Sequence, residues 1–292
     1  MDAPPGALDR RALARAFDRA GPGYDQAATL QQQVRTELLA RLEFFNVAPQ
    51  VVLDLGAGTC QALPSLQQRY PRAQLLGLDL AAGMLQQAPR RRWPARAWSR
   101  VRADAYRLPL AADSVDLVFS NLMLQWCDRL DLAFTEIARV LKPEGLCVFS
   151  TFGPDTLLEL RAAWSAADSL PHVSEFADMP QLGEALMHAG LREPVLDVEH
   201  HQLFYPDAIT LMRSLQHIGA RNALQARARG LTGRQRLRRM QAAYETRRGG
   251  RGLPAAYEVI FGAVFGRVAD SPAGGASGEA VVPLSALRRR PR

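Results

Sequence analysis

Short apolar runs that alternate with helical segments constrain the fold of this chain more than any other feature of its sequence. The runs expected to form strands are residues 51–55, 74–78, 98–103, 115–120, 146–151, 195–205 and 257–268. The segments expected to form helices between them are residues 62–70, 83–90, 131–141, 155–167 and 180–188. Strands that alternate with helices favour a parallel sheet covered on both faces. The sequence therefore predicts an α/β fold.

The other segments suggest how the chain is divided. Residues 1–45 are expected to form helices interrupted by a turn at Gly21-Pro22-Gly23, and residues 46–206 the core. Residues 207–252 are expected to be a helical insertion, helical to about residue 246, that caps one end of the sheet before its last strand at 253–269. The tail at 270–292 is rich in Gly, Ala, Pro and Arg without periodicity and is predicted to be disordered.

Composition excludes several classes of protein. The chain has 292 residues, of which 48% are hydrophobic and 22% charged, so neither a fibrous nor a largely disordered protein fits. No apolar run approaches the roughly 20 residues of a membrane span, and no signal-peptide pattern is present, so we expect a cytoplasmic protein without a membrane partner. The cysteines Cys60, Cys127 and Cys147 are too far apart to suggest a zinc site or a disulfide framework.

The positive charge is concentrated in one segment. The formal net charge is +7, but residues 221–251 hold ten arginines and one acid, a local +9, and residues 270–292 add +2, which leaves −4 for the remainder. An electrostatic partner should therefore dock on this segment, unless the arginines merely form a solvated helix face.

A glycine-rich turn follows the first expected strand in the sequence VVLDLGAGTC. Gly56 and Gly58 would let the backbone approach a ligand closely, at the carboxyl end of the strand where ligands bind in open α/β sheets. A dinucleotide-binding GxGxxG fingerprint would need a third glycine where Gln61 stands. The turn therefore predicts a nucleotide-type site but argues against NAD.

The turn resembles motif I of class I S-adenosylmethionine-dependent methyltransferases, DxGxGTG, with Cys60 where the last glycine is usual. Cysteine is small, so we expect the pocket to survive. The resemblance implies a Rossmann-like, seven-stranded fold and S-adenosyl-L-methionine as cofactor. Asp79 would accept hydrogen bonds from both ribose hydroxyls, Asp104 with Ala105 would meet the adenine amine, and Asn121 would reach the methionine part. The implied cofactor-binding residues are Asp54, Gly56, Ala57, Gly58, Asp79, Leu80, Met84, Asp104, Ala105 and Asn121.

Five further segments resemble malonyl-acyl carrier protein O-methyltransferases, the BioC family of biotin synthesis. They are FDRAGPGYDQAATLQQQV, SNLMLQWC, FSTFGPDTLLELRAAW, LMRSLQHIGARN and LPAAYEVIFG. The resemblance covers about residues 10–268 and implies methyl transfer to the free carboxylate of a malonyl thioester on acyl carrier protein, which initiates pimeloyl synthesis for biotin. A carboxylate is already ionised near neutral pH, so this reaction needs no general base.

Three residues are candidates for holding the substrate. Arg213 could bind the carboxylate through two parallel hydrogen bonds, and Tyr24 and Gln125 could orient it or close over the cofactor. Each also has a structural reading: a salt bridge for Arg213, helix packing for Tyr24, and the turn after a strand for Gln125. His200 and His201 are adjacent on an expected strand and point to opposite faces, so they cannot share a metal, and no metal site is predicted. His217 is expected on a helix surface.

The basic segment suggests an acidic acyl carrier protein carrying the malonyl group as partner. The arginines assigned to this contact are Arg227, Arg229, Arg234, Arg236, Arg238 and Arg239. Nucleic acid is the alternative, but a single-strand platform needs interleaved aromatic residues and this segment offers only Tyr244. The sequence leaves the oligomeric state open.

Three other functions stay open. The chain could methylate a quinone precursor or another small carboxylic acid such as aconitate. It could be an assembly factor of methyltransferase fold, since mitochondrial complex I assembly factors share segments similar to SNLMLQWCDRL. It could also bind the cofactor without catalysis, which the departure at Cys60 allows.

Overall fold

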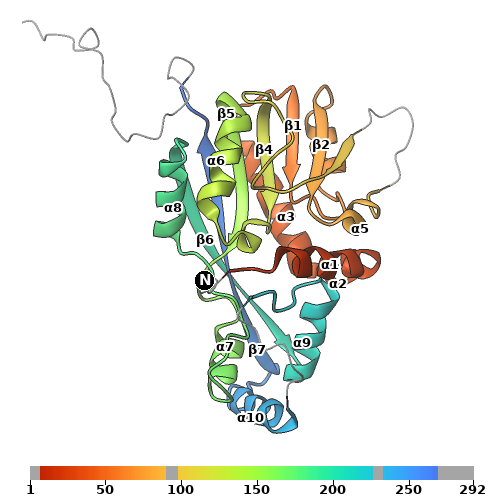
Figure 1. Ribbon diagram of the computed structural model, residues 1–292, viewed down its shortest axis with the longest axis vertical. Helices are drawn as coiled ribbons and strands as arrows, with labels where there is room; N and C mark the ends of the chain where they lie inside the picture. The colour runs from red at the N-terminus through yellow and green to blue at the C-terminus, as the bar shows by residue number, and fades with distance from the viewer. Residues whose placement is uncertain (1–6, 90–97, 226–232, 269–292) are drawn as a thin grey trace, which may run out of the picture.

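The computed structural model describes residues 7–89, 98–225 and 233–268, in which seven strands form one sheet (Figure 1). The strands lie in the order β3-β2-β1-β4-β5-β7-β6. They are β1 (Val51–Leu55), β2 (Gln74–Asp79), β3 (Ser99–Arg102), β4 (Val115–Asn121), β5 (Leu141–Phe152), β6 (Arg192–Tyr205) and β7 (Leu253–Phe265). The first five are parallel, and β7 runs antiparallel to both of its neighbours. The predicted α/β class is confirmed, but the sheet is mixed rather than purely parallel.

Helices cover both faces of the sheet. Helices α3 (Thr29–Arg41) and α4 (Leu63–Arg69) contribute to the hydrophobic cluster on one face, and α6 (Leu130–Val140) and α8 (Met179–His188) to the cluster on the other. Because successive strand residues point to opposite sides, Val52 of β1 packs in the first cluster and Leu53 in the second. This explains why β1 reads as a continuous apolar run.

Aspartates fix the starts of three helices. Asp9 precedes α1 (Arg10–Ala20) and accepts a hydrogen bond from the Ala12 N–H at 2.9 Å. Asp178 forms a capping box with Gln181 at the start of α8, and Asp207 accepts from the Thr210 N–H at 2.8 Å at the start of α9 (Ala208–His217). Such caps satisfy N–H groups that have no partner inside the helix.

A second lobe lies beyond one end of the sheet. Strands β6 and β7 extend into it, and α7 (Leu158–Ser165), α9 and α10 (Arg234–Glu245) surround their ends (Figure 1). Tyr244 of α10 is fully buried, and its hydroxyl donates to the Pro254 carbonyl at 2.7 Å. We call this region the helical lobe. It contains α7, which the sequence placed with the core, in addition to the insertion between β6 and β7.

The insertion is not one continuous helical stretch. Helix α9 ends at His217. Gly219 follows in the left-handed conformation, with φ +77°, and turns the chain out of the helix. A Cβ at this position would lie 2.9 Å from the Phe17 ring. Residues 218–225 then cross to the N-terminal segment, where Leu8 forms a β-bridge with Leu224 and the Asp9 N–H donates to the Ala223 carbonyl at 2.8 Å. This crossing places residues 218–225 against the N-terminal residues that precede α1.

Several predicted boundaries differ from the observed ones. Strand β5 begins at Leu141 instead of residue 146, and α5 (Ala82–Leu85) ends well before the predicted residue 90. The N-terminal part also contains η1 (Gly21–Gly23), α2 (Tyr24–Ala27) and η2 (Leu42–Phe44), and η3 (Leu124–Trp126) follows β4. The predicted tail at 270–292 lies outside the described residues, as do Arg227 and Arg229.

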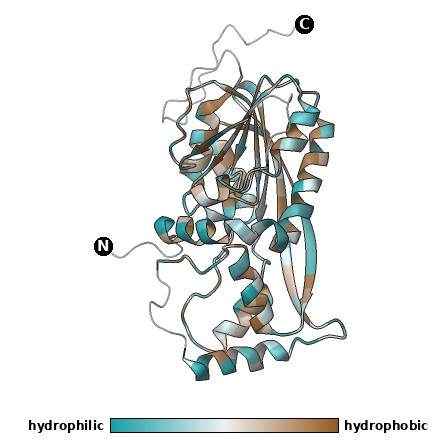
Figure 2. Cartoon of the chain, turned by 90° about the vertical axis from the view of Figure 1, so that its right-hand side faces the viewer, coloured by the Kyte–Doolittle hydropathy of each residue, from teal (hydrophilic) through white to brown (hydrophobic). Residues whose placement is uncertain are grey.

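The helical lobe ends in a hydrophilic helix. The helix at the bottom of Figure 2, α10, is mostly hydrophilic, whereas the buried strand residues of the sheet are largely apolar. No helix among the described residues is long and apolar enough to cross a membrane.

Candidate functional site

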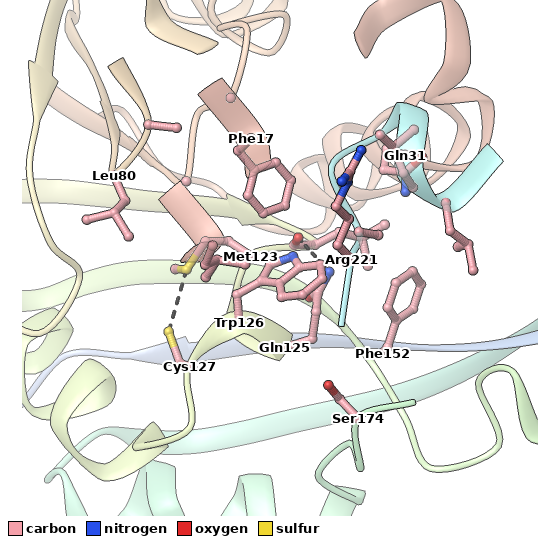
Figure 3. A pocket seen from close by; sticks show the side chains of 18 of the residues that line it. Phe17, Gln31, Leu80, Met123, Gln125, Trp126, Cys127, Phe152, Ser174 and Arg221 are labelled. Carbon is pink, nitrogen blue, oxygen red and sulfur yellow. Dashed lines mark hydrogen bonds between the residues drawn. The ribbon is translucent and has the colours of Figure 1, made fainter. Parts of the chain in front are cut away.

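One cavity opens at the carboxyl ends of β1, β2 and β4 and continues toward the helical lobe (Figure 3). The polar side chains on its wall come from both regions. They are Arg10, Tyr24, Gln31, Asp79, Asn121, Gln125, Thr156, His172, Ser174, Arg221, Asn222 and Tyr257. The strand order reverses between β1 and β4, so the cavity lies at the switch point where ligands of open α/β sheets bind.

The glycine turn forms the cavity wall at the end of β1. Gly56 has φ +75° and Gly58 has φ +54°, and a Cβ on Gly56 would lie 2.2 Å from Met123 Cγ. The N–H groups of Gly56 and Ala57 donate to the Leu78 carbonyl at 2.8 and 2.9 Å, which ties the turn to β2. The backbone conformation and the available space thus both require glycine at position 56.

Asp79 organises the turn from the end of β2. Its two carboxylate oxygens accept hydrogen bonds from the Gly58 and Ala81 N–H groups, each at 2.8 Å. Burial raises the pKa of Asp79, and these two N–H groups act against that rise. Asp79 therefore lines the cavity as a fixed acceptor.

Asp54 lies behind the turn and is only 2% exposed. Its Oδ2 atom has no hydrogen-bond partner among the described residues. Burial, with a further contribution from the nearby Asp79, raises the pKa of Asp54 to about 7. The charge of Arg35 acts against this rise, but an unpaired buried carboxylate is unfavourable in its ionised form, so a positive charge bound near the turn would be favoured.

Cys60 takes a backbone conformation that favours glycine. Its φ is +61°, which explains why a glycine is usual at this point of the motif. The thiol is buried and packs against the backbone at Gly77, away from the cavity wall. Burial raises the pKa of Cys60 to about 12, followed by the effects of Asp54 and Asp79, so the thiol stays protonated. The cavity is present with Cys60 at this position, as its small side chain predicts.

The structure brings most of the predicted cofactor residues to the cavity. Gly56, Gly58, Asp79, Leu80, Met84, Ala105 and Asn121 line it. Asp54 and Ala57 lie behind the turn rather than on the wall. Asp104 is also off the wall, because its carboxylate forms an ion pair with Arg10 and accepts from the Tyr106 N–H at 2.8 Å.

Two of the three predicted substrate residues line the cavity. Tyr24 is half-buried, and its pKa is raised by burial and then by Asp79 and Asp25. Gln125 donates to the Leu122 carbonyl at 2.6 Å, while its buried Oε1 has no hydrogen-bond partner among the described residues. Asn121, which donates to the Gln31 carbonyl at 3.1 Å, lies on the same wall.

The third, Arg213, lies outside the cavity. It is exposed on α9 and assists the Thr210 N–H in lowering the pKa of Asp207. Arg221, eight residues later in the LMRSLQHIGARN segment, lines the cavity instead. Figure 3 shows its guanidinium between Phe17 and Gln31. No ion pair of Arg221 is found within the described residues. His217 is exposed and is not part of the cavity wall.

Two cavity features were not identified from the sequence. Asp25 of α2 accepts hydrogen bonds from Thr59 at 2.6 Å and Gln61 at 2.8 Å, so it fastens the N-terminal helices to the glycine turn. In the helical lobe, Phe152 packs 5.8 Å from Phe176 and 5.7 Å from Tyr257, centroid to centroid, and forms an apolar chamber. Neither feature has a local motif, because each joins residues far apart in the chain.

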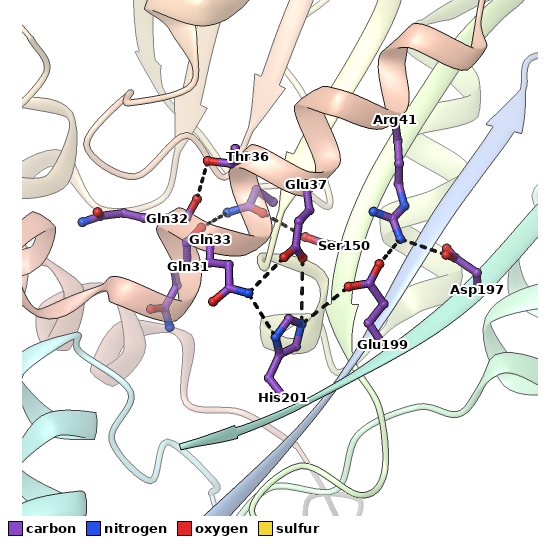
Figure 4. Close-up of polar contacts among 11 residues, drawn as sticks. Gln31, Gln32, Gln33, Thr36, Glu37, Arg41, Ser150, Asp197, Glu199 and His201 are labelled. Carbon is purple, nitrogen blue, oxygen red and sulfur yellow. Dashed lines mark hydrogen bonds and ion pairs between the residues drawn. The ribbon is translucent and has the colours of Figure 1, made fainter. Parts of the chain in front are cut away.

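A cluster of polar side chains links α3 to β6 outside the cavity (Figure 4). The cluster offers three atoms that could coordinate a metal ion, one each from Glu37, Glu199 and His201. These atoms lie within 4.8 Å of one another. However, Arg41 already binds Glu199, and Gln33 contacts His201 Nδ1 at 3.4 Å. We interpret the cluster as a link between helix and strand. His200 is exposed while His201 is largely buried, so the two histidines face opposite sides as predicted.

Comparisons with known proteins agree with this geometry. Residues 53–149 match the methyltransferase domain family. A malonyl-[acyl-carrier protein] O-methyltransferase of Methylovorus sp. is 50% identical over 87% of this chain and 88% of its own. One from Halorhodospira halophila is 42% identical over 98% and 97% of the two chains. Among solved structures, YcgJ of Bacillus subtilis has a TM-score of 0.57 at 16% identity, over 80% of this chain and 99% of its own, a likeness of fold alone. The sheet has the predicted seven-stranded, Rossmann-like methyltransferase architecture, and the chain belongs to the malonyl-[acyl-carrier protein] O-methyltransferase family.

Proposed function

We propose that this protein transfers a methyl group from S-adenosyl-L-methionine to the free carboxylate of a malonyl thioester on acyl carrier protein. This is the step that initiates pimeloyl synthesis for biotin, and we place it in the cytoplasm. The observation that carries the proposal is the single cavity, which extends from the glycine turn and the Asp79 carboxylate to the aromatic side chains of Phe152, Phe176 and Tyr257. One end suits a nucleoside and the other an acyl chain.

The residues at the first end fit the cofactor. The unpaired Oδ2 of Asp54 lacks the donor that an ammonium group would supply, and Asp79 offers a fixed carboxylate for sugar hydroxyls. Gly56 and Gly58 leave room for close approach to the backbone. Leu80, Met84 and Ala105 would enclose the adenine side, and Asn121 would face the methionine part.

The chain's own residues need only bind and align the reactants. When bound, the cofactor supplies an electrophilic methyl group on a positively charged sulfur. The acceptor carboxylate is already ionised at neutral pH, so no side chain has to remove a proton, and alignment supplies most of the acceleration. We assign Arg221 as the ion partner of that carboxylate in place of Arg213, because Arg221 lines the cavity and Arg213 does not. Tyr24 and the free Oε1 of Gln125 would close the wall beside it.

The basic surface of α10 is the proposed docking site for the carrier protein. Arg234, Arg236, Arg238 and Arg239 are all exposed. An acidic carrier would be attracted to this helix, which stands beside the chamber through its contacts with α7.

Methyl transfer from labelled S-adenosylmethionine tests the proposal. Malonyl-acyl carrier protein, malonyl coenzyme A and free malonate are offered in parallel to the purified protein. We expect turnover of the carrier-linked substrate, weaker turnover of the coenzyme A thioester and little of free malonate. No labelled ester with any malonyl thioester would refute the assignment, and methylation of a protein side chain would favour the assembly-factor reading.

A further inference from the structure

His172 is a cavity residue for which the reaction described above gives no role. It lies in the segment after α7, and Ser174, two residues later, also lines the cavity (Figure 3). Its side chain is 15% exposed. An imidazole on the wall of a substrate chamber is a hydrogen-bonding group that the substrate will meet.

Two neighbours hold the imidazole in one orientation. Its ring stacks on Trp164 with centroids 3.7 Å apart and planes 10° apart. Its Nε2 lies 2.8 Å from Asp168 Oδ1, and the same oxygen accepts from the Leu170 N–H at 3.0 Å. Stacking fixes the plane of the ring, and the carboxylate fixes its rotation within that plane.

The carboxylate also selects the tautomer. The Asp168 carboxylate only accepts hydrogen bonds, so in the neutral imidazole the proton resides on Nε2. Nδ1 then presents a lone pair. No hydrogen bond from Nδ1 to another described residue is found, so this acceptor is left for a ligand in the cavity.

The same carboxylate reaches the proposed docking helix. Asp168 Oδ2 lies 3.6 Å from Arg236 Nη1, and the Arg236 side chain is 52% exposed. Arg236, Asp168 and His172 therefore form a line from the surface of α10 to the cavity wall. These contacts connect the proposed docking helix to the cavity wall.

We propose that His172 Nδ1 accepts a hydrogen bond from the amide N–H of the carrier's prosthetic arm nearest to the thioester sulfur. Asp168 and Trp164 act as positioning residues. The malonyl group itself offers only oxygen acceptors, whereas the arm offers amide donors, so the lone pair of Nδ1 matches the arm. The inference rests on the proposed function and assigns the residue that recognises how the substrate is carried.

Two small thioesters that differ in one group test this role. The malonyl thioester of N-acetylcysteamine keeps the amide N–H, and the malonyl thioester of 2-acetoxyethanethiol replaces that N–H with oxygen. Their inhibition constants are measured against methylation of malonyl-acyl carrier protein. The wild-type protein should bind the amide about three- to tenfold more tightly, the effect of one hydrogen bond.

Two variants should remove the preference by different routes. His172→Phe keeps the stacking on Trp164 but has no Nδ1. Asp168→Ala removes the acceptor that keeps the proton on Nε2 and fixes the rotation of the ring, so Nδ1 is no longer held as an acceptor. Each should bring the ratio of inhibition constants close to one and raise KM for the carrier-linked substrate about three- to tenfold, with kcat nearly unchanged. His217→Asn, a change at an exposed histidine outside the cavity, should leave both quantities unchanged.

The outcomes separate the two proposals. If the wild-type protein does not methylate malonyl-acyl carrier protein, the proposed function fails. If it does, but binds both thioesters equally, the role of His172 is wrong. An unchanged KM in His172→Phe and in Asp168→Ala, with thermal unfolding showing both variants folded, would overturn it as well.

Discussion

The two ends of the cavity are constructed differently. At the cofactor end, the wall comes from consecutive strand ends, so a short stretch of sequence carries each contact: the turn at 56–58 after β1, Asp79 at the end of β2, and Ala105 after β3. At the substrate end, the wall combines α1, the segment around His172 and the segment around Arg221, which are far apart in the chain. The geometry of the cofactor end therefore depends on local backbone conformation. The geometry of the substrate end depends on how distant segments pack together.

The largest effect is expected at the cofactor end. Gly56→Ala introduces a Cβ 2.2 Å from Met123 Cγ at a residue with φ +75°, so the turn or Met123 must move. Displacement of a binding loop by about 1 Å can cost about a hundredfold in rate, and we expect kcat/KM to fall by about that factor. Gly23→Ala is the matched control, because a Cβ there meets nothing within 4 Å. Equal activity of the two variants would contradict the assigned role of the turn.

The difference between the two ends explains what the sequence could predict. A strand, a glycine turn and an acid form a pattern that can be recognised within a few residues, and the structure places Gly56, Gly58 and Asp79 of this pattern on the cavity wall. Arg213 has the residue type of a carboxylate ligand, but α9 ends at His217 and the chain changes direction at Gly219, before Arg221. Neither that change nor the stacking of His172 on Trp164 leaves a periodic signal in the sequence.

Asp54 should make stability depend on pH. Its pKa of about 7 in the folded protein is above the roughly 3.9 of an unfolded chain, so between these values the folded state holds more protons. The free energy of unfolding should therefore fall as pH rises from 4 to 7, by on the order of 4 kcal/mol from this group.

Denaturant unfolding of the ligand-free protein at several pH values measures the effect. Asp54→Asn should remove this part of the dependence, whereas Asp155→Asn, at an exposed position, should retain it. Added S-adenosylmethionine should stabilise the wild-type protein more at pH 8 than at pH 5, because its ammonium group favours the ionised carboxylate. Parallel pH curves for wild type and Asp54→Asn would contradict this account.

At the substrate end, two arginines allow a direct comparison. Arg221→Gln should raise KM for malonyl-acyl carrier protein about tenfold, since a charged hydrogen bond to the substrate is lost, and should leave the affinity for S-adenosylmethionine unchanged. Arg213→Gln should change KM less than about twofold, as expected for an exposed side chain outside the cavity. Steady-state kinetics and calorimetry with the cofactor distinguish the two, and the reverse ranking would restore Arg213 as the carboxylate ligand.

The smallest effect is expected on the surface of the helical lobe, where arginines would attract the carrier without touching the reactants. Reversing the charge at Arg238 and Arg239 should lower kcat/KM for malonyl-acyl carrier protein about three- to tenfold at low salt, and the difference should vanish near about 0.5 M salt because screening removes the attraction. Malonyl coenzyme A should be affected less, since it lacks the acidic protein surface. Arg72→Glu reverses a charge at an exposed position outside this lobe and should have little effect. A loss of equal size with both substrates would mean that these arginines stabilise the helical lobe and do not recognise the carrier protein. The enzyme would then recognise only the malonyl group and the prosthetic arm, and not the surface of the carrier.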